Sequence, residues 1–291
     1  FTGSLIRADQ PIVVFSGSEA SDAPWFDTLA ERQCCADHLE EQLDPIRTAG
    51  KYFVASVSPN RTAALALAGA SVGIEDQVEY FRAIAVTEGG ARLSVTVPGQ
   101  GMQTVNLAER GDTIEIVSPV HFVIESDNPI MLGSISPSQA AANVPRGLPG
   151  GDPSFMIVPP VEQFRTSYVF LTPDKYVFDF IRIIAPPDTE MQFDGRPLDE
   201  ALDCDRKSSD SLTEAERGSS EPPFWVYSCQ LSFPIVDNSL DAEAVVSEGL
   251  QNDGVHRLEA TRPIGLLVDG FDSFVSYAYA GGTELSQIVP E

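Results

Sequence analysis

The sequence predicts an all-β protein made of two tandem antiparallel β-sandwich units, of an immunoglobulin-like or jelly-roll-like kind. Alternating or β-branched runs recur along the 291 residues, for example at 52–57, 113–117 and 178–184. Between these runs, 22 prolines and 22 glycines are spread where they would end strands and form turns. No alternation of strands with helices indicates a parallel sheet, so an antiparallel sandwich is the expected architecture.

Several blocks of sequence occur more than once in the same order, which predicts a tandem repeat. A strand, a short turn ending in proline and a second apolar strand recur in three places. The three copies span residues 5–15, 123–132 and 256–267. Because proline is tolerated where a returning strand begins, Pro11, Pro129 and Pro263 each predict a β-hairpin.

Two further blocks repeat in the same order and set the expected domain boundaries. Residues 41–54 are echoed by 162–170, and residues 81–95 by 180–193. A stretch rich in proline and glycine at 143–151 predicts the linker between the units. The expected division is a first unit at 18–148 and a second at 149–291, with an acidic, serine-rich insertion at 199–223. Residues 1–17 are expected to form a hairpin that completes a preceding or adjoining unit.

Few segments have a helical pattern. The best candidate is 27–42, where leucines stand among charged residues, and residues 138–142 are too few for a helix of their own.

Asn60-Arg61-Thr62 is a glycosylation sequon, which is meaningful only in a glycosylating organism.

The net charge of −25 excludes some functions. Nucleic acids and anionic membrane surfaces bind clusters of Lys and Arg, which this chain lacks, so neither is expected as a partner. The uncharged runs are shorter than the ~20 apolar residues of a spanning helix, so no membrane insertion of this segment is expected.

Four cysteines indicate an oxidising compartment. The favoured disulfide joins Cys204 to Cys229 across the insertion, and closing that loop would stabilise the fold by about 3 kcal/mol. The adjacent Cys34 and Cys35 could form a vicinal disulfide or stay reduced, and the sequence leaves both alternatives open.

Blocks of sequence along nearly the whole chain carry a resemblance to a known family. They are residues 2–17, which begin Thr-Gly-Ser-Leu-Ile-Arg-Ala-Asp-Gln-Pro, and residues 35–43, 151–164 and 270–282. With these blocks the sequence resembles the N-terminal region of the IgGFc-binding protein family. The resemblance implies an extracellular, non-enzymatic binding or adhesion region that is part of a larger modular protein with neighbouring domains. The family generally has a further cysteine where this chain has Ser18-Glu19-Ala20, so the usual local disulfide is not assumed here.

No motif predicts a catalytic residue, a metal or a cofactor. Cys34, Cys35, Asp37 and His38 are close in sequence, but they lack the Cys-x-x-Cys and histidine spacing of a zinc site. The aspartates at 203, 205 and 210, and those at 269 and 272, could face calcium, yet neither group matches an EF-hand loop. Solvated acidic loops are therefore the expected structure at both places.

Aromatic residues are the best candidates for a binding face, because they dominate interface hot spots. Trp25, Phe224 and Trp225 are the candidate ligand-binding residues, and core packing is the alternative for each. The predicted function is an extracellular or cell-surface, non-catalytic region that recognises a protein or glycan. Two alternatives remain: a structural spacer that displays other domains, and a glycoside hydrolase that uses paired carboxylates.

Overall fold

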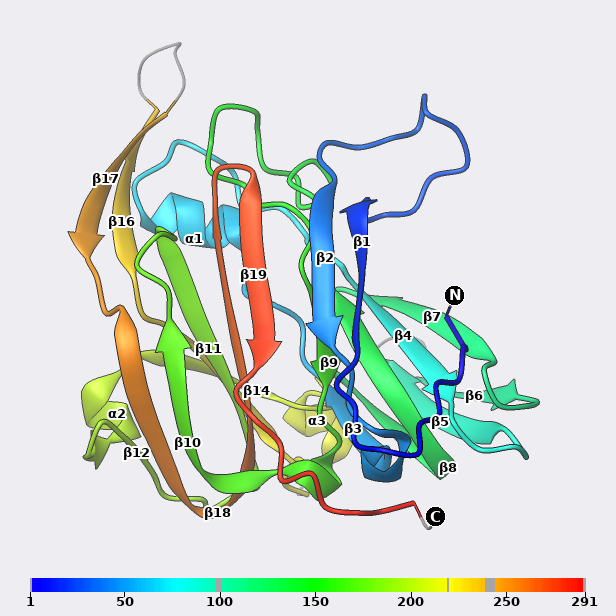
Figure 1. The fold of residues 1–291 in the computed structure, drawn as a ribbon. Coiled ribbons are helices and arrows are strands. Elements are labelled where there is room, and N and C mark those ends of the chain that lie inside the picture. Colours follow the sequence, from blue (N-terminus) through cyan, green and yellow to red (C-terminus); the bar gives the residue numbers. More distant parts are fainter. Residues whose placement is uncertain (1, 98–100, 219, 239–243, 290–291) are drawn as a thin grey trace.

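The computed structural model describes residues 2–97, 101–218, 220–238 and 244–289. Two large antiparallel sheets, each curled into a half-barrel, lie next to each other, together with two ribbons of two strands each (Figure 1). The predicted fold class, an all-β protein with two antiparallel units, is confirmed.

The first half of the chain forms the ribbon β1–β2 and the first sheet. The ribbon consists of β1 (Phe15–Ser21) and β2 (Asp37–Gln42), and the short helix η1 (Ile46–Thr48) follows it. The first sheet contains β3 (Gly50–Ala55), β4 (Glu79–Ala85), β5 (Ala91–Val97), β6 (Gly101–Leu107), β7 (Thr113–Ser118), β8 (Phe122–Ile135) and β9 (Phe155–Val158). Helix α1 (Arg61–Leu67) lies between β3 and β4 in the chain.

The second half forms the second sheet and the ribbon β16–β17. After η2 (Val161–Gln163), the sheet contains β10 (Arg165–Thr172), β11 (Phe178–Ala185), β12 (Met191–Phe193), β13 (Arg196–Pro197), β14 (Cys204–Ser208), β15 (Trp225–Gln230), β18 (Gly254–Asp272) and β19 (Val275–Ala280). The ribbon consists of β16 (Phe233–Asp237) and β17 (Val245–Leu250). Two short helices, α2 (Leu198–Ala201) and α3 (Glu214–Arg217), belong to the insertion.

Each sheet is organised around one long strand that bends at a proline. The first half of β8 lies between β3 and β5, and its second half lies between β4 and β9. The change comes at Pro129, where the register of β3 against β8 shifts between Gly50 and Tyr52. Strand β18 bends in the same way at Pro263. A proline without an N–H fits such a bulge, at which a strand passes from one part of a sheet to another.

The hairpins predicted at these prolines are therefore wrong. Residues 123–132 and 256–267 each belong to a single strand that continues in one direction past its proline. The hairpin expected within residues 1–17 is not observed either, because residues 2–14 form no strand and β1 begins at Phe15.

The same order of pairing occurs in both sheets. Strands β3, β8, β5 and β6 are neighbours in that order, as are β10, β18, β12 and β13. Strands β9, β8, β4 and β7 likewise match β19, β18, β11 and β15. The division at residue 148 stays a prediction; in the structure β9, which follows that point in the chain, pairs with the first sheet.

The predicted helix at 27–42 is absent, and a strand occupies its second half. Residues 37–42 alternate between exposed and more buried positions, and only Leu39 is fully buried. This period of two is that of a strand, and the leucines of the segment are not spaced to make one continuous helical face. Helix α1 was not predicted, although Asn60 caps it by accepting a hydrogen bond of 2.8 Å from the Ala63 N–H.

Each half-barrel encloses its own apolar core, and a further cluster joins the two sheets. Phe53, Phe81 and Phe122 are buried in the first core, and Ile181 and Leu258 in the second. The joining cluster contains Val54, Met156, Phe164, Ile184, Val226 and Leu267. It places β3 and β9 of the first sheet against a face of the second.

The start of β3 packs tightly against the helix η2 that leads into the second sheet. The Lys51 N–H donates a hydrogen bond of 2.8 Å to the Glu162 carboxylate. A Cβ atom added at Gly50 would overlap with the ring of Pro160. Glycine at position 50 is therefore what permits this close approach.

We predict that Gly50→Ala lowers the free energy of unfolding by about 1–3 kcal/mol, because the new methyl group overpacks the junction. Urea denaturation followed by fluorescence measures the change. Gly89→Ala is the matched control, since nothing lies within 4 Å of a Cβ at that position. Equal effects of the two substitutions would contradict the tight junction.

Candidate functional site

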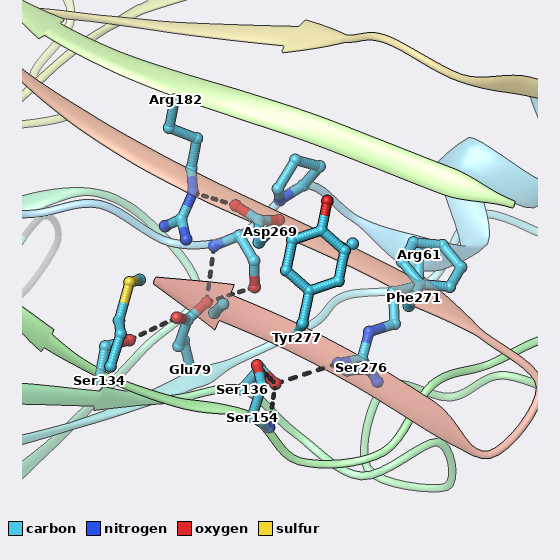
Figure 2. A pocket seen from close by; sticks show the side chains of 15 residues that line it. Arg61, Glu79, Ser134, Ser136, Ser154, Arg182, Asp269, Phe271, Ser276 and Tyr277 are labelled. Carbon is cyan, nitrogen blue, oxygen red and sulfur yellow. Dashed lines mark hydrogen bonds and ion pairs between the residues drawn. The ribbon is translucent and has the colours of Figure 1, made fainter. Parts of the chain in front are cut away.

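Two features of different character lie where the sheets meet, a buried polar cluster and an open cleft. Figure 2 shows the cluster, in which Arg182 of β11 points toward Asp269 of β18. The Arg182 Nε donates to Asp269 Oδ1 at 2.8 Å, and its Nη1 donates to the Ser56 carbonyl oxygen of the first half of the chain. Burial raises the pKa of the Asp269 carboxyl, and the charge of Arg182 opposes that rise.

A second buried guanidinium fixes the segment that connects the sheets. Arg61 of α1 donates to the carbonyl oxygens of Pro137 and Gly150 at 2.8 and 2.7 Å. It also lies over the ring of Phe271, at 5.6 Å from the ring centre. Burial lowers the pKa of Arg61 to about 10, so the side chain remains charged at neutral pH.

Buried carboxylates complete the cluster. Glu79 of β4 accepts hydrogen bonds from the Ser58 N–H at 2.6 Å and from the Ser134 hydroxyl at 2.5 Å (Figure 2). Asp179 of β11 accepts from the Tyr277 hydroxyl at 2.6 Å, and burial raises its pKa to about 6.

The polar cluster is a structural element and does not offer a ligand site. The space that Arg61, Arg182, Glu79 and Asp269 enclose is only about 10 Å³. Sites for small molecules typically have a volume of about 300–1,000 Å³. Apart from the Arg182 Nη2, which has no hydrogen-bond partner among the described residues, its charged groups hydrogen-bond to one another, to hydroxyls or to the backbone, so its role is to hold the two sheets together.

The cleft is a much larger hollow of about 750 Å³ between the two halves of the molecule. One wall comes from the first half of the chain, with α1, the segment around Pro59 and His121. The other wall comes from the second half, with Cys204, Lys207 and neighbouring residues of β14 and β15. Hollows of about 580 Å³ beside Tyr279 and about 570 Å³ beside Leu198 are also of ligand size, but each is smaller than the cleft. The cleft, which both halves of the molecule line, is therefore the candidate functional site.

His121 is a buried, neutral member of the first wall. The Val57 N–H donates to its Nδ1 at 3.1 Å, so the proton of the neutral ring is on Nε2. Burial lowers the pKa of His121 to about 3, and the positive charges of Arg182 and Lys207 lower it further. At neutral pH the ring is therefore a hydrogen-bonding group without charge, and it is far from the pKa that general acid–base catalysis requires.

The disulfide Cys204–Cys229 strengthens the second wall. The two cysteines are directly opposite each other on β14 and β15, and the predicted pairing is confirmed. It fixes the outer strand of the second sheet, which carries Asp205 and Lys207. The Lys207 ammonium and the Asp205 carboxylate are 3.1 Å apart, and both side chains are exposed.

The structure does not bring the three predicted aromatic residues together. Trp25 is 78% exposed and stacks on Phe26 in the loop between β1 and β2. Phe224 packs at the junction of the sheets, with ring centres 5.9 Å from Tyr52 and 6.1 Å from Phe164. Trp225 begins β15, and the guanidinium of Arg206 covers its ring at 4.4 Å.

The other chemical candidates are engaged elsewhere. Cys34 and Cys35 are joined in a vicinal disulfide. His38 is exposed and lies 3.4 Å from the carboxylate of Glu40. Asp210 pairs with Arg217 at 3.3 Å, and Asp269 pairs with Arg182 at 2.8 Å. Among the described residues, no group of three or more His, Cys, Asp or Glu side chains is arranged to hold a metal ion.

No pattern in the sequence indicates the cleft. Its walls come from segments far apart in the chain, and neither His121 nor Lys207 belongs to a motif. The disulfide was the one residue pair next to the cleft that spacing could indicate. In the part of the chain that the structure describes, no helix is long and apolar enough to cross a membrane.

The fold and junction define a disulfide-containing protein of two tandem, curled antiparallel sheets. A family model described as IgGFc binding protein matches residues 1–270. The chain therefore belongs to the IgGFc-binding protein family, as its sequence blocks indicated. No curated protein and no solved structure matches the chain.

His121 provides a test of the geometry of the first wall. Its pKa is lower in the folded chain than the usual 6.5, so the folded state binds fewer protons as the pH falls from 6.5 toward 3. The stability that the neutral ring contributes is complete above pH 6.5 and is lost as the pH falls through that range. The pKa values of Asp152 and Asp179 are raised to about 6, so these carboxyl groups favour the folded state more as the pH falls. They do so equally in a His121 variant, and their contribution cancels in the difference between the two proteins.

We predict that the difference in unfolding free energy between the wild type and His121→Gln falls by about 1.4 kcal/mol per pH unit as the pH drops below 6. Urea titrations of both proteins at pH 7, 5 and 4 measure it. A difference that stays constant with pH would show that His121 titrates alike in the folded and unfolded chains.

Proposed function

We propose that the chain is a non-catalytic binding or adhesion region of an extracellular or cell-surface protein, and that the cleft between its sheets holds a protein or glycan ligand. The observation that carries this proposal is the cleft itself. It has about 750 Å³ of space, while the other polar junction of the two sheets is closed.

The lining of the cleft suits recognition of a polar ligand. Lys207 and Asp205 on β14 are both exposed, at 66% and 63% of their side chains, and they offer donor and acceptor groups. Asp76 provides an exposed carboxylate on the opposite wall. Phe233 and Leu67 add apolar surface at the same opening. Such a mixture can contact the hydroxyls and the apolar faces of a sugar, or the side chains of a protein.

The covalent structure supports an extracellular location. All four cysteines are joined in disulfides, and disulfides persist mainly in oxidising compartments. The Cys204–Cys229 bond lies at the wall of the cleft, where it would keep a binding surface rigid. A rigid surface loses less conformational entropy on binding.

The state of the ionisable groups favours binding over catalysis. The one histidine of the cleft is neutral, with its pKa lowered to about 3. A glycoside hydrolase requires two carboxyl groups that face one substrate, one of which is kept protonated. Of the three aspartates that line the cleft, Asp205 forms an ion pair with Lys207. A pure spacer would need no cleft, and binding measurements distinguish that alternative.

We predict that Lys207→Ala weakens binding to the ligand about tenfold, because a charge-assisted hydrogen bond contributes about 1.5 kcal/mol. Glycan arrays and pull-downs from extracellular material identify the ligand, and titration of the purified ligand gives the affinities. Lys175→Ala is the matched control, since Lys175 is also exposed beside an aspartate but does not line the cleft.

If neither Lys207→Ala nor Lys175→Ala changes the affinity, the ligand binds outside the cleft. Failure to find any ligand would favour the spacer. Hydrolysis of a glycan on the array would favour the enzyme.

A further inference from the structure

The ribbon β1–β2 repeats the pairing that closes each of the two complete sheets. Phe15, four residues after Pro11, is opposite Gln42. Gly133 occupies the same place after its own proline, and it is opposite Ile157 of β9. In the second sheet, the residue four positions after Pro263 is Leu267, and it is opposite Ala280 of β19. The first ribbon is thus a third copy of one structural element.

The chain continues in the same way after each of these pairings. Helix η1 begins four residues after Gln42, and helix η2 begins four residues after Ile157. The first strand of a complete sheet follows in both cases, β3 after η1 and β10 after η2. By this spacing, β2 corresponds to β9, which is the last strand of a half-barrel.

The packing of the ribbons has the same order. Strand β9 of the first sheet lies against β19 of the second, and β2 lies against β9. Each closing strand therefore contacts the closing strand of the next half-barrel. The contact between β2 and the first sheet therefore uses the same kind of strand as the contact that joins the two complete sheets.

The apolar side chains of this third copy are exposed, unlike their counterparts. Ile6 and Ile12 are 59% and 53% exposed. Ile124 and Ile130, which have the same positions relative to Pro129, are 0% exposed in the core of the first half-barrel. The counterparts relative to Pro263 are Leu258 and Ile264, and both are also 0% exposed. Large aliphatic side chains at such positions are normally buried.

We propose that β1 and β2 are the closing ribbon of a third half-barrel of the same architecture, which residues preceding Phe1 in the full-length polypeptide supply. Residues 5–14 then form the first part of the long strand of that half-barrel, which β1 continues, and Ile6 and Ile12 pack into its core. The exposed side chains of Ile6 and Ile12, and the register that β1–β2 shares with β8–β9, support this third half-barrel. It does not depend on the proposed function of the cleft.

Thiol labelling of Ile12→Cys tests the proposal. All four native cysteines are in disulfides, so the introduced thiol is the only one that reacts with a maleimide. In the 291-residue chain, we expect it to react as fast as the thiol of Ile74→Cys, whose isoleucine is 69% exposed. In the full-length polypeptide, the Ile12→Cys thiol should react at least about tenfold more slowly, while the Ile74→Cys thiol is unchanged.

Equal labelling of Ile12→Cys in the two proteins would overturn the proposal. Protection that appears in the 291-residue chain as its concentration rises would also overturn it, because a second copy would then be the partner. If the variant fails to fold, hydrogen exchange of residues 5–14 in the two unmodified proteins replaces it. Slower exchange in the full-length polypeptide supports the third half-barrel, and equally fast exchange contradicts it.

Discussion

The buried guanidinium of Arg182 accounts for how the molecule is assembled, because its hydrogen-bond acceptors come from both half-barrels. Arg182 belongs to the second sheet and is 0% exposed, and its partners are Asp269 of the same sheet and the carbonyl oxygen of Ser56, which follows β3 of the first. A charge without water is costly unless it is paired and hydrogen-bonded. The second sheet is therefore complete only when the first is docked against it. Arg82, which occupies the corresponding position of the first sheet, is exposed and pairs with Glu115 at a distance of 2.8 Å. Arg82 and Arg182 thus have equivalent positions in the two sheets. Arg182 is a buried charge because the first sheet is docked against its side of the second.

This docking also creates the cleft. The polar cluster and the apolar contacts of Val54 with the second sheet hold the halves together on one side, and Arg61 fixes the connecting segment through the carbonyl oxygens of Pro137 and Gly150. The walls diverge toward His121 and Lys207, where about 750 Å³ stays open. The disulfide Cys204–Cys229 fixes the strand that forms the outer wall. The site thus results from the arrangement of two similar units, and neither unit contains it alone.

The sequence predicted the elements that depend on local pattern, but not those that depend on docking. Alternating strands, the repeated blocks and the spacing of Cys204 and Cys229 were sufficient for the fold class, the repeat and one disulfide. The prolines do not distinguish a hairpin from one bent strand, because a reversing turn and a bulge both place proline before an apolar strand. Asn60 fits both a glycosylation sequon and a helix cap, and the sequence does not show that it caps α1. In the fold its amide also donates to the Glu75 carbonyl oxygen. Phe224 was considered for ligand binding, yet it packs between the sheets, and sequence alone does not distinguish an interface inside the chain from one with a partner.

Because the Arg182 junction joins them, the two half-barrels form one cooperative body. Differential scanning calorimetry of the unmodified chain at pH 7 tests this cooperativity most directly. We expect a single transition in which the calorimetric enthalpy equals the van't Hoff enthalpy, as for a two-state domain. Two separated transitions, each with about half of the total enthalpy, would show that the sheets unfold independently and would contradict it.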